Sequence, residues 1–491
     1  MTKGSIKNMA VLTTEEIIEA TGGKLLSGDL KSPEHFRGVS IDSRTISDGE
    51  IFFTLRGQRF DGHDFLKEAL LKGDGAVVDI EPQEVSEGKV IIYVEDTLRA
   101  LQDLAHFLRL KQDIPVIAIT GSNGKTTTKE MIHAILSKRF KVIKNEGNLN
   151  NHIGLPLSLT RIAPDDEVAV LELGMNASGE IRRLCEIAVP THGVITNIGS
   201  AHIGNLGNLE SIRSAKLEIL KGLAVMVLNA DDSFLMQGYE STRTQRSFDG
   251  RLITFSVNSN SDVRADDVVV NGNGSRFTLK VKRIPPHPPL PKGGKGDFQS
   301  NISITLNVHG LFNVYNALAA SAVCLSLGMS LEEIKTALEF YKAFPMRFEV
   351  VRQNSITLIN DSYNANPSSM KEALKELVHM KGKGRAVAVL GDMLELGEFS
   401  GKAHSDIIKI AADMGINIFV AVGEMMNLAA QKSREEINQK LGSNSGFTVY
   451  TFNNADEAGQ NISGIIKQGD VVLIKGSRVM GMEKIIERIR G

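Results

Sequence analysis

The chain has 491 residues, of which 42% are hydrophobic, and its 56 Lys and Arg nearly balance its 58 Asp and Glu. The net charge of −2 argues against a dedicated nucleic-acid coat or a basic membrane-surface protein, and no apolar run approaches the ~18 residues of a spanning helix. Only Cys185 and Cys324 occur, which excludes a disulfide framework and a cysteine-based zinc site. Residues 1–16 contain no apolar stretch of a secretory signal, so we expect a cytoplasmic protein that is not inserted in a membrane.

The length predicts roughly three domains, and the first is expected at residues 9–110. Thr13 and Glu16 have the spacing of a capping box, which predicts the start of a helix. The apolar spacing from Leu98 to Leu108 predicts a second helix. Short strands are predicted at 36–44, 50–57, 75–80 and 90–96. This segment is therefore expected to be a small α/β domain.

The second domain is expected at residues 111–342 and has the pattern of a mostly parallel sheet. A continuous apolar run at 116–120 is typical of a strand buried on both faces. Apolar strands at 167–173 and 191–198 are each followed by polar residues and a helical pattern. Helices are predicted at 312–328 and 330–341.

Residues 284–301 are dense in Pro and Gly and cannot form the interior of a helix or a strand. They lie between two strand-like runs, 276–283 and 302–310. We interpret them as an exposed hairpin insertion. A Pro-rich ligand for a partner domain is the less favoured alternative.

The third domain is expected at residues 343–491. Apolar strands with helices between them are predicted at 355–361, 386–392, 418–423 and 471–476. This alternation predicts a doubly wound, Rossmann-like sheet. The whole chain is thus expected to be an α/β protein with a small N-terminal domain, a central P-loop domain with a mostly parallel sheet, and a C-terminal doubly wound domain.

The strongest local motif follows the strand at 116–120, where a glycine-rich turn leads into a helix. The backbone N–H groups of such a turn close around phosphate oxygens, and the helix N-terminus adds a positive dipole. Lys125 is placed to reach the β- and γ-phosphates of ATP, and Thr126 to hold Mg²⁺ through its hydroxyl. The strict P-loop has Gly where this chain has Ile119, so the turn is a shorter form, and a glycine-rich turn that binds nothing is the alternative. The predicted ATP-binding residues of the turn are Gly121, Ser122, Asn123, Gly124, Lys125, Thr126 and Thr127.

Two further strands of the central domain end in polar residues, at Glu172 and at Asn197 with His202 beyond it. Ligands in open α/β sheets gather at the carboxyl ends of strands, so Glu172 could ligate Mg²⁺ directly or through water. From the residues alone, His202 is better interpreted as a loop histidine. Lys216 and Glu218 lie on a predicted amphipathic helix and are interpreted as part of its solvated face.

Motifs along essentially the whole chain resemble, in order, those of the Mur ligases, the ATP-dependent amino-acid or peptide ligases of peptidoglycan precursor synthesis. These motifs are TGSNGKTTTKE, ELGMNASGEI, TNIGSAHI, SAKLEI, NVYNALAA, PMRFE and INDSYNANPSSM. Three segments are similar to the members that join D-alanyl-D-alanine to a UDP-N-acetylmuramoyl-tripeptide. They are DSRTISDGEIFFTLRGQRFDGHDF, NLNNHIGLPLSL, and NDSYNANPSSMKEAL followed by AVLGDMLELGE.

The resemblance implies roles for the residues that match the family motifs. Lys125 and Thr126 match the ATP γ-phosphate and Mg²⁺ residues, and Glu172 and His202 match the ligands of a second Mg²⁺. Lys216 is similar to the family's carbamylated lysine, whose carboxylate-like group can help hold magnesium. The implied nucleotide contacts beyond the turn are Asn313, Asn316, Arg347 and Asp361. Phe312 stands where the family's G-x-H-N-x-x-N motif has His, which is a departure.

The resemblance also places substrate contacts in the two outer domains. The UDP group is expected at Ser43, Arg44, Arg56, Asp61 and His63. The dipeptide is expected at Asn364, Asn366, Asp392 and Glu395. The segment Lys475–Arg478 could add positive charge near a ligand carboxylate, and a solvated turn is its alternative.

The implied reaction transfers the ATP γ-phosphoryl group to the terminal carboxylate of the UDP-linked peptide, and the amine of the dipeptide then attacks the acyl phosphate. We expect ATP and Mg²⁺ as cofactors, the two peptides as substrates, no nucleic-acid partner and a monomer. A hinge is expected near Phe344–Arg347, so that the third domain can close.

Two other functions stay open from the sequence. A sister ligase would add a single amino acid to a shorter UDP-muramoyl-peptide, but it should have an Asp-Asn-Pro-Arg run where this chain has NANPSSM. A P-loop ATPase that switches a partner is the second alternative, and the Pro-rich insertion is its only support.

Overall fold

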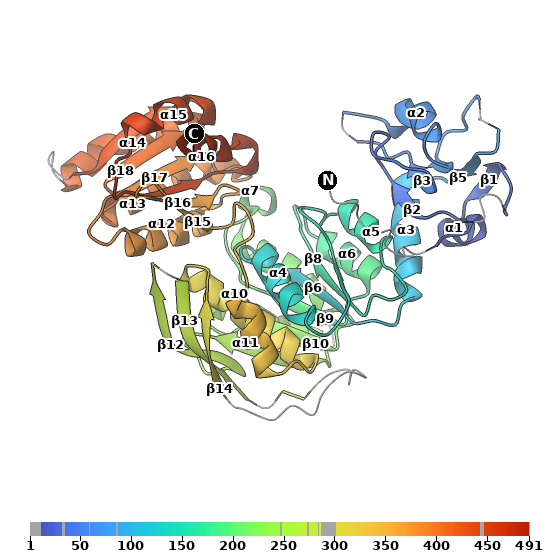
Figure 1. Cartoon of the computed structure of the whole chain (residues 1–491), viewed down its shortest axis with the longest axis horizontal. Coiled ribbons are helices and arrows are strands. Elements are labelled where there is room, and N and C mark those ends of the chain that lie inside the picture. The colour runs from blue at the N-terminus through green and yellow to red at the C-terminus, as the bar shows by residue number, and fades with distance from the viewer. Residues whose placement is uncertain are drawn as a thin grey trace.

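The structure is a computed structural model that describes residues 11–31, 35–57, 59–84, 87–245, 248–272, 274–282, 284–285, 301–441 and 446–490. The described residues form three separate sheets, each with its own helices (Figure 1). The fold is therefore the predicted α/β architecture of three domains. The boundaries at 9–110, 111–342 and 343–491 stay predictions.

The first sheet has the order β1-β5-β4-β3-β2. Its strands are β1 (Lys24–Ser27), β2 (Gly38–Ser40), β3 (Glu50–Phe53), β4 (Gly75–Val78) and β5 (Val90–Tyr93). All pairs are parallel except β1 with β5. Helix α1 (Thr14–Thr21) begins at the predicted capping box of Thr13 and Glu16, α2 spans Leu66–Leu70, and α3 (Thr97–Leu110) packs its apolar face on the sheet.

The central sheet has the order β14-β13-β12-β11-β10-β9-β6-β8-β7. Its strands are β6 (Val116–Thr120), β7 (Val142–Lys144), β8 (Val168–Glu172), β9 (His192–Ile195), β10 (Val225–Asn229), β11 (Arg251–Ser256), β12 (Val263–Asn271), β13 (Gly274–Val281) and β14 (Asn301–Leu306). Pairing is parallel from β7 to β12 and antiparallel from β12 to β14. No strand was predicted at β10, β11 or β12.

Helices cover both faces of the central sheet, which explains the continuous apolar strands at its centre. One layer contains α4 (Lys125–Leu136), α10 (Leu311–Ser326) and α11 (Leu331–Glu339). The other contains α5 (Gly154–Leu159), α6 (Glu180–Ala188), α8 (Leu209–Lys216) and α9 (Ser233–Gln245). The strand-like runs around the Pro-rich segment are β13 and β14, which pair antiparallel; residues 286–300 of the predicted insertion lie outside the described residues.

The third sheet has the order β15-β16-β20-β17-β18-β19, and only β15 runs antiparallel to its neighbour. Its strands are β15 (Glu349–Gln353), β16 (Ile356–Asp361), β17 (Ala386–Gly391), β18 (Ile418–Val422), β19 (Thr448–Phe452) and β20 (Val471–Lys475). Apolar clusters on both faces pack under α12 (Pro367–Lys381), α13 (Ser400–Asp413) and α14 (Glu424–Leu441) on one side, and under α15 (Ala455–Asn461) and α16 (Glu483–Arg490) on the other. The doubly wound prediction is confirmed.

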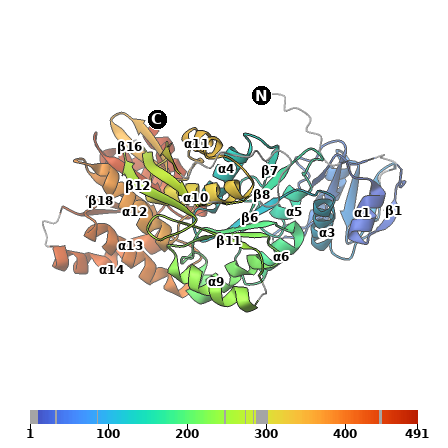
Figure 2. The ribbon, with the colours of Figure 1, turned by 90° about the horizontal axis from the view of Figure 1, so that it is seen from below.

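The third domain lies against the central domain, while the first domain lies at the opposite end of the molecule (Figures 1 and 2). The short helix α7 (Ile203–Leu206) contacts the third domain directly, because the Gly204 N–H donates to the Glu395 carbonyl at 3.0 Å. Within the described parts of the chain, every helix is too short or too polar to cross a lipid bilayer.

Candidate active site

A cavity of about 810 Å³ lies between the central and third domains. The carboxyl ends of β6, β8 and β9 open into it, as expected for a ligand site in an α/β sheet. The predicted site residues that line it are Ser122, Asn123, Gly124, Lys125, Thr126, Thr127, Glu172, His202, Asn313, Asn316, Arg347, Asp361, Asn364, Asn366 and Glu395. Residues far apart in the sequence, such as Thr126 and Arg347 at 221 positions, therefore meet at one place.

The glycine-rich turn after β6 needs its glycines. Gly121 and Gly124 have positive φ angles of 147° and 83°, and a Cβ on Gly121 would lie 1.9 Å from Thr196 Oγ1. Helix α4 begins directly after the turn at Lys125, whose Nζ donates to the Gly121 carbonyl at 3.0 Å. Burial lowers the pKa of Lys125, and the nearby Glu172 carboxylate opposes that shift. A cation and free helix N–H groups thus share one turn, which suits a phosphate.

Glu172, at the end of β8, is the centre of the polar network beside this turn. Its side chain accepts from Thr126 Oγ1 at 2.8 Å and from Asn150 Nδ2 at 2.9 Å. The buried Asn145 fixes its backbone, accepting from the Glu172 N–H at 2.9 Å and donating to its carbonyl at 3.0 Å. Arg347 donates to Thr126 Oγ1 at 3.1 Å from the third-domain side. Sequence reasoning did not assign roles to Asn145 and Asn150, although the NLNN segment that holds Asn150 was one of the family-like motifs.

His202, in the loop after β9, also lines the cavity. This residue has a left-handed backbone with φ of 64°, and its Nδ1 lies 2.8 Å from a carboxylate oxygen of Glu395. His202 and the charge of Lys125 both lower the pKa of Glu395, with His202 the larger cause. The pair therefore joins a central-domain loop to the third domain.

Lys216 and Glu218 are buried, so the interpretation of both as a solvated face is wrong. Lys216 is 1% exposed, and its pKa is lowered well below the ordinary value by burial and by the charge of Lys125. Glu218 accepts hydrogen bonds from the N–H groups of Gly179 and Arg182 at the start of α6. The amphipathic pattern of this helix predicted that its polar face was exposed to solvent, but such a pattern does not show whether other elements cover that face.

Hard oxygen ligands are what Mg²⁺ prefers, and Thr126 Oγ1 and Glu172 Oε2 offer two of them 2.8 Å apart. The described residues contain no cluster of three His, Cys, Asp or Glu side chains ready to hold a metal. The donor set at Thr126 and Glu172 nevertheless fits a magnesium ion that also takes phosphate oxygens and water.

The predicted nucleotide residues on α10 are held by one another. Asn316 Nδ2 donates to Asn313 Oδ1 at 3.1 Å, and Thr128 of α4 donates to Asn316 Oδ1 at 3.3 Å. Phe312, at the departure from the family motif, lines the cavity and packs edge-on against Phe348 with ring centroids 5.2 Å apart. An apolar ring thus occupies the position of the family's imidazole.

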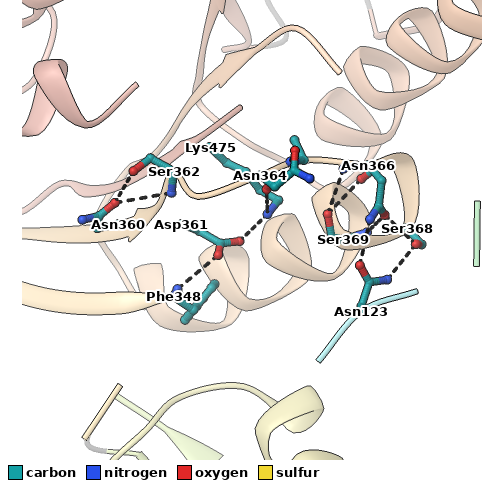
Figure 3. Close-up of polar contacts among 11 residues, drawn as sticks. Asn123, Phe348, Asn360, Asp361, Ser362, Asn364, Asn366, Ser368, Ser369 and Lys475 are labelled. Carbon is teal, nitrogen blue, oxygen red and sulfur yellow. Dashed lines mark hydrogen bonds and ion pairs between the residues drawn. The ribbon is translucent and has the colours of Figure 1, made fainter. Parts of the chain in front are cut away.

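On the third-domain side, Asp361 organises the strand ends (Figure 3). It accepts from the Phe348 N–H at 3.1 Å and from Lys475 Nζ at 2.6 Å, and Lys475 also donates to the Asn364 carbonyl. In the same region of the cavity, the Arg347 guanidinium carbon lies 3.7 Å from the centroid of the Tyr363 ring. Sequence reasoning missed Tyr363, which lies within the quoted NDSYNANPSSM motif.

Eight of the predicted site residues are not among those that line the cavity. Asp392 is buried, and its carboxylate accepts from the Met425 and Met426 N–H groups at the start of α14. The five predicted UDP residues lie in the first domain, where they pair locally: Arg44 with Asp42, Ser43 with Glu68, and Arg56 and His63 with Asp61 and Asp79. Gly121 lies beside Thr196, and Lys216 lies close enough to Lys125 for the two charges to interact.

Three family models match this chain along its length. They are the Mur ligase family catalytic domain at residues 35–109, the Mur ligase middle domain at 119–324, and the Mur ligase glutamate ligase domain at 346–478. A Bacillus subtilis protein named UDP-N-acetylmuramoyl-tripeptide--D-alanyl-D-alanine ligase is 34% identical over 99% of this chain and 98% of its own length. The chain therefore belongs to the Mur ligase family.

Solved structures narrow the likeness to one type of Mur ligase. The crystal structure of MurF from Acinetobacter baumannii superposes with a TM-score of 0.83 at 29% identity, covering 98% of this chain and 99% of that one. MurF ligase from Thermotoga maritima in complex with ADP superposes with a TM-score of 0.75 at 26% identity, covering 92% and 96%. Among Mur ligases, the chain is of the MurF type.

Proposed function

We propose that this chain is the ATP-dependent ligase that joins D-alanyl-D-alanine to UDP-N-acetylmuramoyl-tripeptide in peptidoglycan precursor synthesis. The observation that carries the proposal is the convergence of the P-loop, Glu172 and Arg347 from two domains on one cavity, in a chain of the MurF type. We place the reaction in the cytoplasm because it consumes ATP, and we expect the enzyme to act as a monomer.

The proposed chemistry divides between the domains. Lys125 and the N-terminus of α4 hold the triphosphate while the terminal carboxylate of the tripeptide attacks the γ-phosphorus, which forms an acyl phosphate and releases ADP. The dipeptide amine then attacks the acyl carbon, and phosphate leaves as the amide forms. Charge neutralisation matters most here because the reacting groups are anionic, and Arg347 adds a second cation opposite Lys125.

The metal ligands are proposed from the contact between Thr126 and Glu172 and, for His202 and Lys216, from the match to the family motifs. Thr126, Glu172, His202 and Lys216 as a carbamate would hold Mg²⁺, which supplies charge to offset that of the phosphates. Carbamylation requires an uncharged amine, and the lowered pKa of the buried Lys216 supports it. Asn313, Asn316 and Asp361 would hold the nucleotide from opposite sides of the cavity.

The test is release of phosphate from ATP by the purified protein with UDP-N-acetylmuramoyl-tripeptide, with and without D-alanyl-D-alanine. Release that requires both peptides, with a product heavier by the dipeptide, is the expected result, and Lys125→Ala should abolish it. Release only with a shorter acceptor and a free amino acid would move the chain to the sister activity. Release that ignores both peptides would favour the switch ATPase.

A further inference from the structure

The side chain of Asn123 points out of the phosphate turn and into the third domain (Figure 3). Its Nδ2 donates to Ser368 Oγ at 2.9 Å, Ser368 Oγ donates to Asn366 Oδ1 at 2.7 Å, and Asn366 Nδ2 donates back to Asn123 Oδ1 at 2.8 Å. These three hydrogen bonds close a ring across the domain interface. We call Asn123, Asn366 and Ser368 the amide clasp.

The backbone of Asn123 is already fixed within the central domain. Its N–H donates to Asn197 Oδ1 at 2.9 Å, and its carbonyl accepts from Thr196 Oγ1 and Asn197 Nδ2. The N–H of Asn123 therefore does not point at a phosphate, and its amide side chain reaches the other domain from a rigid base.

Asn366 and Ser368, the third-domain residues of the clasp, are also held in place, because they lie at the start of α12. Asn366 is the N-cap: its Oδ1 accepts from the Ser369 N–H, and its own N–H donates to Ser369 Oγ, which completes a capping box. Pro367 follows at the first helical position. Ser368 Oγ also packs against the loop after β9, since a Cβ on Gly199 would lie 2.9 Å from it.

The clasp lies at one end of a longer interface made by α12. Farther along this helix, Glu376 accepts from the Leu311 N–H of the central domain at 3.3 Å, and the His379 ring lies 2.7 Å from the Val270 carbonyl. Among the contacts along α12, the clasp is the one that touches the phosphate turn itself. It therefore sets where the third domain sits relative to the triphosphate site.

From these contacts we infer that the amide clasp holds the third domain closed over the phosphate turn, which makes Asn123, Asn366 and Ser368 positioning residues for the ligase reaction. This inference rests on the proposed function, and it gives Asn123 and Asn366 a role other than contact with ATP or dipeptide. A substrate that binds only the closed form has an apparent affinity proportional to the fraction of protein that is closed, so its apparent affinity falls when that fraction falls. Loss of the clasp should therefore raise KM for the dipeptide that the third domain delivers. It should weaken ADP binding by a smaller factor, because Lys125 and the phosphate turn stay on the central domain while only the contacts from Arg347 and Asp361 are loosened.

The experiment compares Ser368→Ala with the matched control Ser369→Ala. Both remove one hydroxyl from the first turn of α12, but Ser369 bonds to Asn366 within the cap and not to the central domain. Gly199→Ala is a second variant that disturbs the clasp without substituting any of its three residues, because its Cβ would push Ser368 Oγ aside. The readouts are KM for D-alanyl-D-alanine, the dissociation constant of ADP by calorimetry, and the radius of gyration from X-ray scattering.

We expect Ser368→Ala and Gly199→Ala to raise KM for the dipeptide about fivefold, as the loss of one or two neutral hydrogen bonds implies, and to increase the radius of gyration. The dissociation constant of ADP should rise by a smaller factor than KM for the dipeptide, and Ser369→Ala should leave both KM and the radius of gyration at their wild-type values. Equal KM values and equal scattering for Ser368→Ala and Ser369→Ala would overturn the clasp, as would a larger loss of ADP affinity than of dipeptide affinity. If the wild type released phosphate without needing the dipeptide, the proposed function would fail, and scattering would still decide the clasp.

Discussion

Lys216 is the residue whose surroundings differ most from what its sequence context suggests. It lies among charged residues on an amphipathic helix, yet it is 1% exposed. Burial disfavours the ammonium form and lowers its pKa, so a larger share of the amine is uncharged and able to react with carbon dioxide. The resulting carbamate would replace a buried cation with an oxygen ligand.

Lys216→Ala should lose ligase activity, because the variant has no amine to carbamylate. Short carboxylic acids such as acetate should restore part of that activity by occupying the vacated volume with a carboxylate. The measurement is phosphate release at increasing acetate concentration, and Lys221→Ala, which removes an exposed lysine nearby, is the control. Full activity of Lys216→Ala, or no response to any short acid, would contradict the carbamate.

Tyr363 is a second residue whose role depends on its neighbour. The Arg347 guanidinium stacks on its ring while donating to Thr126, and the residues on both sides of Arg347, Met346 and Phe348, have positive φ angles of 61° and 53°. Non-glycine residues hold such angles only where surrounding contacts impose them. The aromatic face therefore helps to hold Arg347 over the phosphate turn.

Tyr363→Leu should lower kcat about tenfold, because a cation–π contact is worth roughly 1 to 2 kcal/mol when it is partly desolvated. Tyr363→Phe keeps the ring and should retain most of the activity. Steady-state kinetics of the two variants test this role. Equal losses in both would assign the effect to the phenol hydroxyl instead of the ring.

At the scale of elements, the loop after β17 is held by one buried histidine. His404 on α13 accepts from the Met393 N–H through Nε2 at 2.9 Å, and its Nδ1 lies 2.7 Å from the Ser400 carbonyl. Leu394 adds a hydrogen bond from its N–H to Ser477 Oγ. These contacts fix the loop so that Glu395 lies next to His202, and they therefore connect α13 to the edge of the cavity.

His404 must be neutral to accept from Met393, and burial lowers its pKa, while the charge of Asp392 opposes that shift. Its pKa is then lower in the folded than in the unfolded state, so the contribution to stability is complete above about pH 6.5 and declines as pH falls below it. Burial also lowers the pKa values of His133 and His309, so their contributions to folding stability should likewise decline as the pH falls.

His404→Gln, which cannot titrate, should lose less thermal stability than wild type between pH 7.5 and pH 5.5. Scanning calorimetry at the two pH values measures the difference. The exposed His35→Gln serves as control and should follow wild type. A decline in His404→Gln as steep as that of wild type would contradict the prediction.

At the scale of the whole molecule, the cavity is lined by the central and third domains, while the candidate UDP residues lie in the first. A ligand that binds only the folded state adds about 2.7 kcal/mol at a hundred times its Kd. Magnesium ADP should therefore raise the unfolding temperature of the central and third domains together and leave a separate first-domain transition in place. Calorimetry with and without ligand measures the shift, and Lys125→Ala should lose most of it. A shift confined to the first domain would contradict the site.

Much of the architecture could be predicted because it depends on local patterns. The capping box at Thr13, the buried strand at 116–120 and the glycine turn at 121–124 are set by contacts between residues a few positions apart, and all three are present. Strands β10 to β12 were not singled out, although β10 is as long and as buried as β6, because no recognisable chemical motif drew attention to them. Fold class and the phosphate turn were accordingly the firmest predictions.

Contacts between distant segments were decided only by the tertiary structure. Asn123 and Ser368 are 245 positions apart, and Thr126 and Arg347 are 221 apart, so no periodicity or propensity could pair them. The burial of Lys216 and the pairing of Arg56 with Asp61 and Asp79 likewise depend on what packs around each side chain. The α/β class, the phosphate turn and the family could be recognised without the structure, because each depends on short-range sequence patterns. The closed arrangement of the domains and the partners of each charge were decided by the packing of whole sheets and helices, which no short segment encodes.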